Sequence, residues 1–417
     1  MKKTLISTVS ALTLCVAANA AAAETLKVGV LATLEGTYTA LGEDGVRGVR
    51  TALEKAGYKA GGRDIEIIIQ STDTSPDSAV RGARKLVEQD GVEIVVGPLS
   101  GSEGIAIRDF SKTAPQVTFI NGSSGALETT YVTPSDNFFR FNTDGGQWSV
   151  GLGDYVFNEK GWETVATVGE DYSFVYTQVM GFTVDFCQAG GEVTEALWVP
   201  LGTKDFGSII ASLPDDVDAI YLGLGGGDAV NFLNQYQQAG GDANLIGGTI
   251  MVNGDVLNSK GDAKNALIGT PSSGPQADTS EDPAWQEYVK LYQDTFAPED
   301  RFPSPSLLAT TYYNATTAML TCVDQTGGSF GDGQADLRSC LASLELDSPT
   351  GKIVLDENRQ AVATTFVNEV VELDDGTLAN AMVAKYDNVT QTLGLEKAAF
   401  DAIGLPSREL PVCKTSY

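Results

Sequence analysis

Short apolar segments alternate with amphipathic segments along this chain, and no other feature of the sequence constrains the fold as strongly. After residue 25, segments rich in β-branched residues predict strands at 26–32, 64–70, 93–97 and 116–120. Helical periodicity lies between them at 42–57, 76–89 and 101–113. This order predicts an α/β fold with a mainly parallel sheet, flanked by helices, whose strand ends lie at one edge.

The pattern pauses near 141–146 and then restarts, which indicates a second α/β unit of similar size. Its expected strands are 164–169, 192–200, 217–223 and 244–250, and its expected helices are 174–189, 206–213 and 228–239. Further helices are expected at 284–296, 306–324 and 334–344, before a tail over 352–386 that reads as strands around the turn signal DDGT. Junctions near 142–146, 270–276 and 348–352 resemble chain crossings between two lobes.

The N-terminus has the organisation of a secretory signal peptide over residues 1–23. Lys2 and Lys3 precede an apolar run and the small residues ANAAAA, which predicts cleavage after Ala20 or Ala23. The run is too short to span a bilayer, which argues against a membrane anchor. A lipoprotein would use Cys15, but Leu14 stands where a small residue is expected. We expect an exported protein.

Four cysteines remain after export, and an even count in an oxidising compartment predicts two disulfides. Three pairings are possible, and the sequence alone does not choose between them. The preferred one joins Cys322 to Cys340 locally and ties the tail through Cys187 and Cys413. The spacing of these cysteines is not typical of a metal site, so no metal is expected.

Composition argues against most catalytic chemistry and against nucleic acid as a partner. The chain contains no histidine, which removes the Ser-His-Asp, Cys-His and His-zinc sites. It has no P-loop, and GLGGG at 223–227 falls short of a dinucleotide fingerprint. Without Lys2 and Lys3, 25 basic residues face 55 acidic ones, a net charge of −30 that repels nucleic acid. We expect neither an enzyme nor a bound cofactor.

Two loops rich in serine and glycine follow neighbouring predicted strands, at 97–104 and 121–126. In an open α/β sheet, ligands bind beyond the carboxyl ends of the strands. Hydroxyls, accessible backbone N–H groups and nearby helix starts suit a small carboxylate. The alternative is ordinary turn and capping chemistry, for which serine and glycine are equally typical.

Aromatic residues follow the first strand of the second unit. Tyr172 and Phe174 would face the same edge and could cover an apolar ligand across an interdomain cleft, as could Tyr38 and Leu41 in the first βα loop. The alternative is that these side chains pack within their own domain.

With these residues in view, the chain resembles a known family. The passages LKVGVLATLEGTYTALGEDGVRGVRTALEKAG and SPDSAVRGARKLVEQDGVEIVVGPLS, the loop FINGSSG and the segment DYSF resemble the solute receptors of branched-chain amino-acid-type ABC importers, which are type I periplasmic binding proteins. The resemblance implies two lobes, 24–143 plus 272–350 and 144–271 plus 351–417, joined by three crossovers at a hinge.

The resemblance also implies a set of ligand-binding residues. Family members hold a ligand carboxylate on two loops that match this chain's Ser100, Gly101 and Ser102, and its Gly122, Ser123 and Ser124. Phe174 matches an aromatic cover with Tyr172 beside it, and amino-acid receptors often have a serine where Gly101 stands. Receptors for α-amino acids usually present a carboxylate to the ligand ammonium at the position where this chain has Thr249. Because a buried ammonium without an anionic partner is costly, an ordinary branched-chain amino acid is disfavoured.

We therefore expect a periplasmic solute receptor that binds a small carboxylate-bearing or polar organic solute, amino-acid-like or an aromatic acid, by hinge closure. The expected partners are that solute and the inner-membrane permease subunits of an ABC importer, and the protein is expected to be a monomer without direct membrane insertion. One alternative is a sensor of the same fold that signals to a separate partner. A carboxylate-dependent enzyme is the other.

Overall fold

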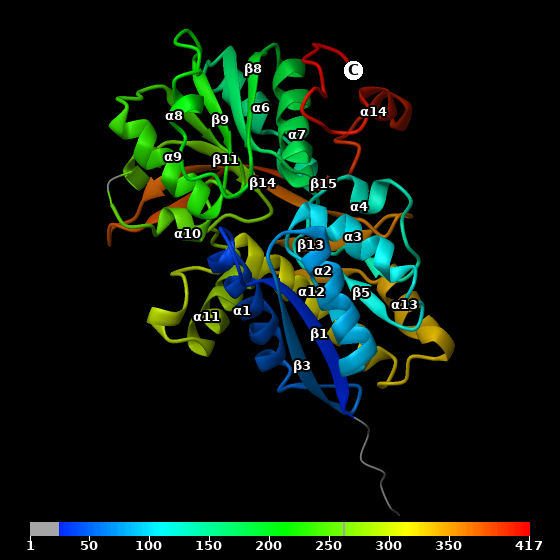
Figure 1. The fold of residues 1–417 in the computed structure, drawn as a ribbon. Helices are drawn as coiled ribbons and strands as arrows, with labels where there is room; N and C mark the ends of the chain where they lie inside the picture. The colour runs from blue at the N-terminus through cyan, green and yellow to red at the C-terminus, as the bar shows by residue number, and fades with distance from the viewer. Residues whose placement is uncertain (1–24, 262) are drawn as a thin grey trace, which may run out of the picture.

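The computed structural model describes residues 25–261 and 263–417, which form two lobes, each built on one sheet (Figure 1). The predicted cleavage site after Ala20 or Ala23 lies outside the described residues. Among those residues, no helix is long and apolar enough to cross a membrane.

The first lobe contains a six-stranded sheet in the order β2-β3-β1-β4-β5-β6. Its strands are β1 (Leu26–Thr33), β2 (Lys59–Ala60), β3 (Arg63–Thr72), β4 (Ile94–Val96), β5 (Thr118–Ile120) and β6 (Phe138–Phe139). All neighbours pair in parallel except β2 and β3. The ends of β1, β4 and β5 therefore meet at one edge, as the strand order predicted.

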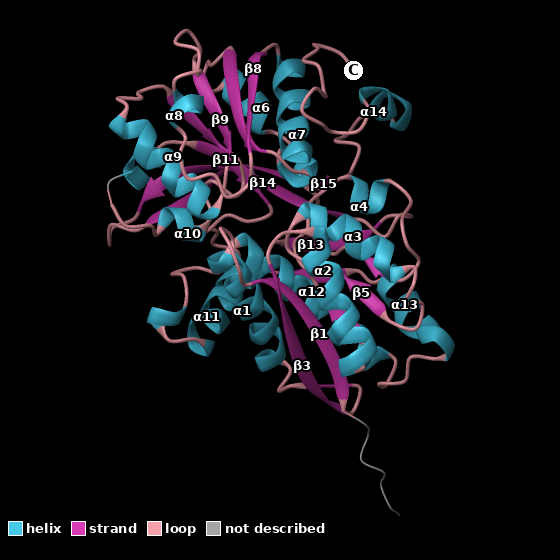
Figure 2. Cartoon of the chain, viewed as in Figure 1, coloured by secondary structure: helices cyan, strands magenta, loops and turns pink. Residues whose placement is uncertain are grey.

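Helices cover both faces of this sheet (Figure 2). One face packs against α1 (Thr39–Lys55), α11 (Pro283–Thr295), α12 (Leu307–Gln325) and α13 (Ala335–Ser343), and the other against α2 (Pro76–Arg84) and α3 (Gly101–Ser111). Val28 and Val30 of β1 belong to the first core and Leu31 to the second. A central parallel strand buried on both faces needs this continuous apolar run.

The second lobe is built on a nine-stranded sheet in the order β12-β13-β14-β11-β10-β9-β7-β8, with β15 paired to β14, and the β12–β13 end of this sheet reaches the first lobe, where Leu346 and Ile353 pack in its core. The strands from β7 to β11 are parallel: β7 (Thr164–Glu170), β8 (Glu192–Val199), β9 (Ala219–Gly223), β10 (Asn244–Gly247) and β11 (Pro271–Gly274). The others pair antiparallel: β12 (Leu346–Ser348), β13 (Gly351–Leu355), β14 (Ala361–Glu372) and β15 (Leu378–Val389).

Three apolar clusters stabilise this lobe. One packs α6 (Leu152–Asn158) and α7 (Ser173–Ala189) on the sheet, a second packs α9 (Gly226–Gln238) and α10 (Gly254–Leu257), and a small third one joins Met180 of α7 to Phe400 near the C-terminus. The remaining helices are short: α4 (Glu128–Tyr131), α5 (Gly145–Trp148), α8 (Gly207–Ile210) and α14 (Lys397–Ile403). The predicted two-lobed α/β class with flanking helices is confirmed.

Several element boundaries differ from the sequence prediction. The strand expected at 244–250 ends at Gly247, because the chain turns there toward α10. The helix expected at 76–89 is α-helical only to Arg84 and continues as a π-helical turn that ends before Gly91, whose φ of 67° requires the left-handed region. The helix expected at 206–213 shortens to Gly207–Ile210.

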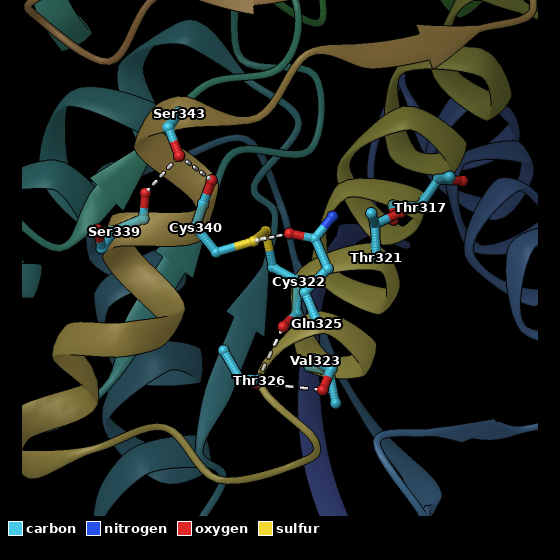
Figure 3. The surroundings of a disulfide bond; sticks show 9 residues. All are labelled: Thr317, Thr321, Cys322, Val323, Gln325, Thr326, Ser339, Cys340 and Ser343. Carbon is cyan, nitrogen blue, oxygen red and sulfur yellow. Dashed lines mark hydrogen bonds between the residues drawn. A yellow bond between two sulfur atoms is a disulfide. The ribbon is translucent and has the colours of Figure 1, made fainter.

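Both preferred disulfides are present. Cys187 near the end of α7 is bonded to Cys413 in the C-terminal tail, and Cys322 of α12 to Cys340 of α13 (Figure 3), with Cα–Cα separations of 5.5 and 5.7 Å. The preferred pairing is confirmed.

Candidate functional site

A small cavity lies between the two lobes, beyond the carboxyl ends of their parallel strands. The first lobe supplies the start of α1, the loops after β4 and β5, and the start of α12, and the second supplies α5, the β7–α7 loop and the turn after β10. Ten residues line it: Tyr38, Leu41, Leu99, Ser123, Trp148, Tyr172, Phe174, Ile250, Leu307 and Leu308. This is the position at which open α/β sheets bind ligands.

A larger hollow of about 590 Å³ lies elsewhere, between β8 and the C-terminal tail. Its lining residues all come from the second lobe and its tail. A ligand there would contact one lobe only and would have no means of favouring one lobe arrangement over another. The interlobe cavity is therefore the better candidate for a functional site.

The cavity wall is apolar and aromatic. The rings of Trp148 and Phe174 pack edge to face with centroids 5.4 Å apart, and Tyr172 lies 6.0 Å from Phe174. None of the ten described lining residues carries a formal charge. The site therefore suits a solute with an apolar body and a few polar atoms.

Two donors on this wall lack a hydrogen-bond partner within the described part of the chain. Trp148 is 1% exposed, and its indole N–H is unpaired. The hydroxyl of Ser123 is also unpaired, while its backbone N–H donates to Pro98 O at 3.0 Å. Because an indole can only donate, an acceptor atom on a solute would satisfy Trp148.

A buried carboxyl group lies behind the tyrosine side of the cavity. The Tyr38 hydroxyl is hydrogen-bonded to Glu170 at the end of β7, and it lies 3.1 Å from the Tyr172 hydroxyl. Gly225 N donates to the other Glu170 oxygen at 3.2 Å. Burial raises the pKa of Glu170 well above its usual value, and the charge of Asp228 adds to this.

Direct contacts hold the two lobes together around the cavity. Thr37 Oγ1 donates to Asp228 Oδ1 at 2.8 Å, and the hydroxyls of Ser102 and Ser173 lie 3.1 Å apart. The cavity itself measures only about 20 Å³, space for about one water molecule. This lobe arrangement is therefore closed.

Four of the ligand-binding residues predicted from the sequence line the cavity: Leu41, Ser123, Tyr172 and Phe174. Tyr172 is the N-cap of α7 and Phe174 lies in its first turn, so the loop that follows β7 brings both to the cleft. Their contribution to binding stays a prediction.

The two predicted serines around the start of α3 do not line the cavity. The Ser100 hydroxyl donates to Thr74 O at 3.3 Å, and its backbone N–H donates to Glu103 in a capping box. Ser102 instead bridges to Ser173 of the other lobe. One residue therefore stabilises a helix start, and the other holds the lobes together.

The two predicted glycines lie where a side chain would collide. A Cβ atom on Gly101 would lie 2.8 Å from the backbone N and the Cβ of Phe174, and one on Gly122 would lie 2.3 Å from the Tyr312 ring. Gly101 is thus a point of close contact between the lobes, whereas Gly122 packs inside the first lobe.

Ser124 and Thr249 also lie outside the cavity lining. Ser124 is fully buried with its hydroxyl against Gly104, and its carbonyl accepts from Asn121 Nδ2 at 3.0 Å. Thr249 Oγ1 accepts from Gln178 Nε2 at 2.7 Å, and the next residue, Ile250, reaches the cavity instead.

The sequence prediction missed several lining residues: Leu99, Trp148, Ile250, Leu307 and Leu308. It also did not anticipate the contact between Tyr38 and Glu170, two residues 132 positions apart. Leu307 and Leu308 are the first residues of α12. This helix packs in the first lobe, although it follows the parallel strands of the second lobe in the sequence. A strand–helix pattern carries no signal for such a long-range contact.

Comparisons with known proteins agree with this architecture. A family profile described as "Periplasmic binding protein" matches residues 25–377. The Leu/Ile/Val-binding protein homolog 6 of Brucella melitensis is 25% identical over 397 residues, which cover 93% of this chain and 97% of the relative.

Two solved structures are similar over most of the chain. The solute-binding protein of an ABC transporter from Rhodopseudomonas palustris BisB5, in complex with 3,4-dihydroxybenzoic acid, is 26% identical with a TM-score of 0.79, covering 88% of this chain and 98% of that one. An ABC transporter substrate-binding protein from Sphaerobacter thermophilus is 28% identical with a TM-score of 0.77, covering 87% and 98%. With its two lobes and interlobe cavity, this chain belongs to the periplasmic binding protein family.

Proposed function

We propose that the protein is the periplasmic solute receptor of an ABC importer, and that it binds a small organic acid with an apolar body in the interlobe cavity. The cavity supports this proposal most directly, because both lobes supply apolar walls and uncharged donors to it. Binding leaves the solute chemically unchanged. The solute-binding relatives from R. palustris and S. thermophilus support the same role.

Closure of the lobes is the mechanism. Residues 24–143 plus 272–350 form one lobe and residues 144–271 plus 351–417 the other, joined by three crossovers. A solute that contacts Ser123 and Leu308 on one side and Trp148 and Phe174 on the other gains contacts only when the lobes close. This differential affinity shifts the population toward the closed state. The lobes open to admit the solute, and the lining side chains shift to make room for a solute larger than water when the lobes close again.

The solute carries a carboxylate or a neutral polar acceptor and no ammonium group. The Ser123 hydroxyl and the Trp148 N–H supply donors, and Thr249 offers no countercharge. The named relatives point to two chemistries, aromatic acids for the R. palustris protein and branched-chain amino acids for the Brucella homologue. The uncharged wall favours an aromatic or branched aliphatic acid.

The partners are the solute and the permease subunits of the importer. The exported chain is cleaved after Ala20 or Ala23, acts as a monomer in the periplasm and does not insert into the membrane. Its strong negative charge opposes nucleic-acid binding.

Calorimetry with matched solutes tests this assignment. We expect benzoate or 4-methylpentanoate to bind with a micromolar Kd, and leucine, which is 4-methylpentanoate with an α-ammonium, to bind at least tenfold more weakly. Phe174→Leu should raise the Kd about tenfold, since it removes ring contacts worth about 1.4 kcal/mol. Ser212→Ala, on the surface of the second lobe, is the control. Micromolar leucine binding without any response to the two acids would refute the proposed solute class.

A further inference from the structure

A chain of three oxygen-bearing side chains runs from the interior of the second lobe to the cavity wall. Glu170 is fully buried and hydrogen-bonded to Tyr38, which lies 3.1 Å from the Tyr172 hydroxyl. Glu170 and Tyr172 flank the end of β7, whereas Tyr38 comes from the other lobe at the start of α1. The chain is therefore complete only when the lobes are closed.

The direction of the hydrogen bonds along this chain depends on Glu170. A tyrosine hydroxyl has one hydrogen to donate, and an ionised carboxylate can only accept. If Glu170 is ionised, Tyr38 donates to it, Tyr172 donates to Tyr38, and only an acceptor oxygen remains for the cavity. If Glu170 is neutral, it donates to Tyr38, Tyr38 donates to Tyr172, and Tyr172 has its hydrogen free for the cavity.

We propose, on the basis of the function proposed above, that Glu170 is a positioning residue for the solute: in its neutral form it turns Tyr172 into a donor for the solute's anionic group, so that binding of an organic anion is coupled to a proton on Glu170. Gly225 N donates to Glu170 Oε1, so this oxygen is an acceptor. The proton of the neutral carboxyl group therefore lies on Oε2, the oxygen that contacts Tyr38. The arrangement adds a third donor to those of Ser123 and Trp148.

Burial and two neighbouring carboxyl groups favour the neutral form of Glu170, and two hydrogen bonds oppose it. Burial has the largest effect and raises the pKa of Glu170, hydrogen bonds from Tyr38 and from Gly225 N lower it, and the charges of Asp228 of α9 and Asp255 of α10 raise it. Burial raises the pKa of Asp255 itself to about 7, and the exposed Lys204, at 4.0 Å, is the only cation paired with Asp228 among the described residues. Burial raises the pKa of Tyr172, and the charge of Glu103 of α3 adds to this effect. Burial raises the pKa of Glu103 itself to about 7.

The sign of the pH dependence follows from this linkage. An anion that binds the neutral form of Glu170 binds fully below the raised pKa of that group and loses affinity as the pH rises through it. An ionised Glu170 would also repel the anion, which acts in the same direction. We therefore expect proton uptake on binding above that pKa.

The test measures benzoate affinity by calorimetry from pH 5.5 to 9. Wild type should lose up to about tenfold in affinity per pH unit above the Glu170 transition, because one proton is linked to binding. Calorimetry in two buffers of different ionisation enthalpy should show uptake of up to one proton per benzoate bound.

Variants distinguish a positioning role of Glu170 in solute binding from a role in stabilising the fold alone. Glu170→Gln keeps a donor for Tyr38 and an acceptor for Gly225 N, so it should retain the low-pH affinity and lose the pH dependence. Tyr172→Phe should bind about tenfold more weakly at low pH and also lose the pH dependence. Asp185→Asn is the matched control, because burial also raises the pKa of Asp185, to about 6, away from the cavity, and it should keep the wild-type slope.

The outcomes distinguish the two proposals. If wild type binds neither benzoate nor 4-methylpentanoate at any pH, the proposed function fails and the role of Glu170 fails with it. If wild type binds benzoate with no pH dependence and no proton uptake, the receptor function stands and the role of Glu170 is overturned. A Glu170→Gln variant with the wild-type slope would overturn it equally.

Discussion

Gly101 shows how the absence of a side chain can serve the function of a two-lobed protein. It opens α3 in one lobe, and a Cβ there would come within 3.0 Å of three Phe174 atoms in the other. Receptors that this chain resembles often carry a serine at this position. Here the same space is filled by the backbone N, Cα and Cβ of Phe174, whose ring forms part of the cavity wall, so the glycine allows the segment that carries this ring to approach the first lobe.

Gly101→Ser should therefore oppose closure without unfolding either lobe. We expect the benzoate Kd to rise at least tenfold, about 1.4 kcal/mol, while the melting temperature without solute changes little. Gly207→Ala is the control, since a Cβ there meets only the Asp205 side chain at 3.2 Å. Unchanged affinity in Gly101→Ser would show that the lobes need not approach this closely to hold the solute.

At the scale of elements, the sequence predicted the strands and helices that follow a simple period, and it failed where tertiary contacts decide. Apolar runs such as 26–32 and 164–169 became central strands, because burial on both faces leaves an unambiguous pattern. The two-residue strand β6 and the four-residue helix α5 carry too few residues for any period. Trp148 was missed for this reason, although it lines the cavity.

The serine loops illustrate the same limit for the site. The sequence placed both loops at the correct sheet edge, and Ser123 does line the cavity. It could not distinguish that hydroxyl from those of Ser100, which donates to Thr74 O, and Ser124, which is buried without a hydrogen-bond partner among the described residues. The same residue type can cap a helix, pack in the core or bind a ligand, and only its contacts with segments distant in the sequence show which role it has.

The disulfides differ in the length of chain that they close. Cys187–Cys413 spans 226 residues and fixes the C-terminal tail to α7, whereas Cys322–Cys340 spans 18 and joins two adjacent helices. In the chain-entropy description, the longer loop contributes about 5 kcal/mol to the free energy of unfolding and the shorter about 3 kcal/mol.

Replacing both cysteines of a pair by alanine tests this difference. The Cys187→Ala/Cys413→Ala variant should lose more unfolding free energy in denaturant titrations than the Cys322→Ala/Cys340→Ala variant, and its tail should become the first site of proteolysis. Equal losses would indicate that local packing, and not loop closure, determines the contribution.

Polar contacts between the lobes help to hold the whole molecule closed, beside the apolar contacts around the cavity. Thr37 donates to Asp228, whose pKa is raised by burial, and Leu127 N donates to Thr177 Oγ1 at 3.0 Å. Contacts between the lobes are lost when the lobes separate, so each is expected to add to solute affinity without adding to the stability of a separate lobe.

Thr37→Val should therefore weaken benzoate binding about fivefold, near the 1 kcal/mol of a typical hydrogen bond, and leave unfolding unchanged. Thr203→Val, which loses a hydrogen bond to Pro200 O within one lobe, is the control. In small-angle scattering, the benzoate concentration at which half of the protein becomes compact should rise in Thr37→Val and stay unchanged in Thr203→Val. An unchanged concentration in both variants would show that the Thr37–Asp228 hydrogen bond does not contribute to closure.

The cavity has a further consequence for biogenesis, because Leu307 and Leu308 complete its wall from a helix that follows nearly three quarters of the chain. A polypeptide still emerging from the ribosome has no finished pocket until this helix has folded back onto the first sheet. The wall of the cavity is therefore complete only after about three quarters of the chain have been synthesised.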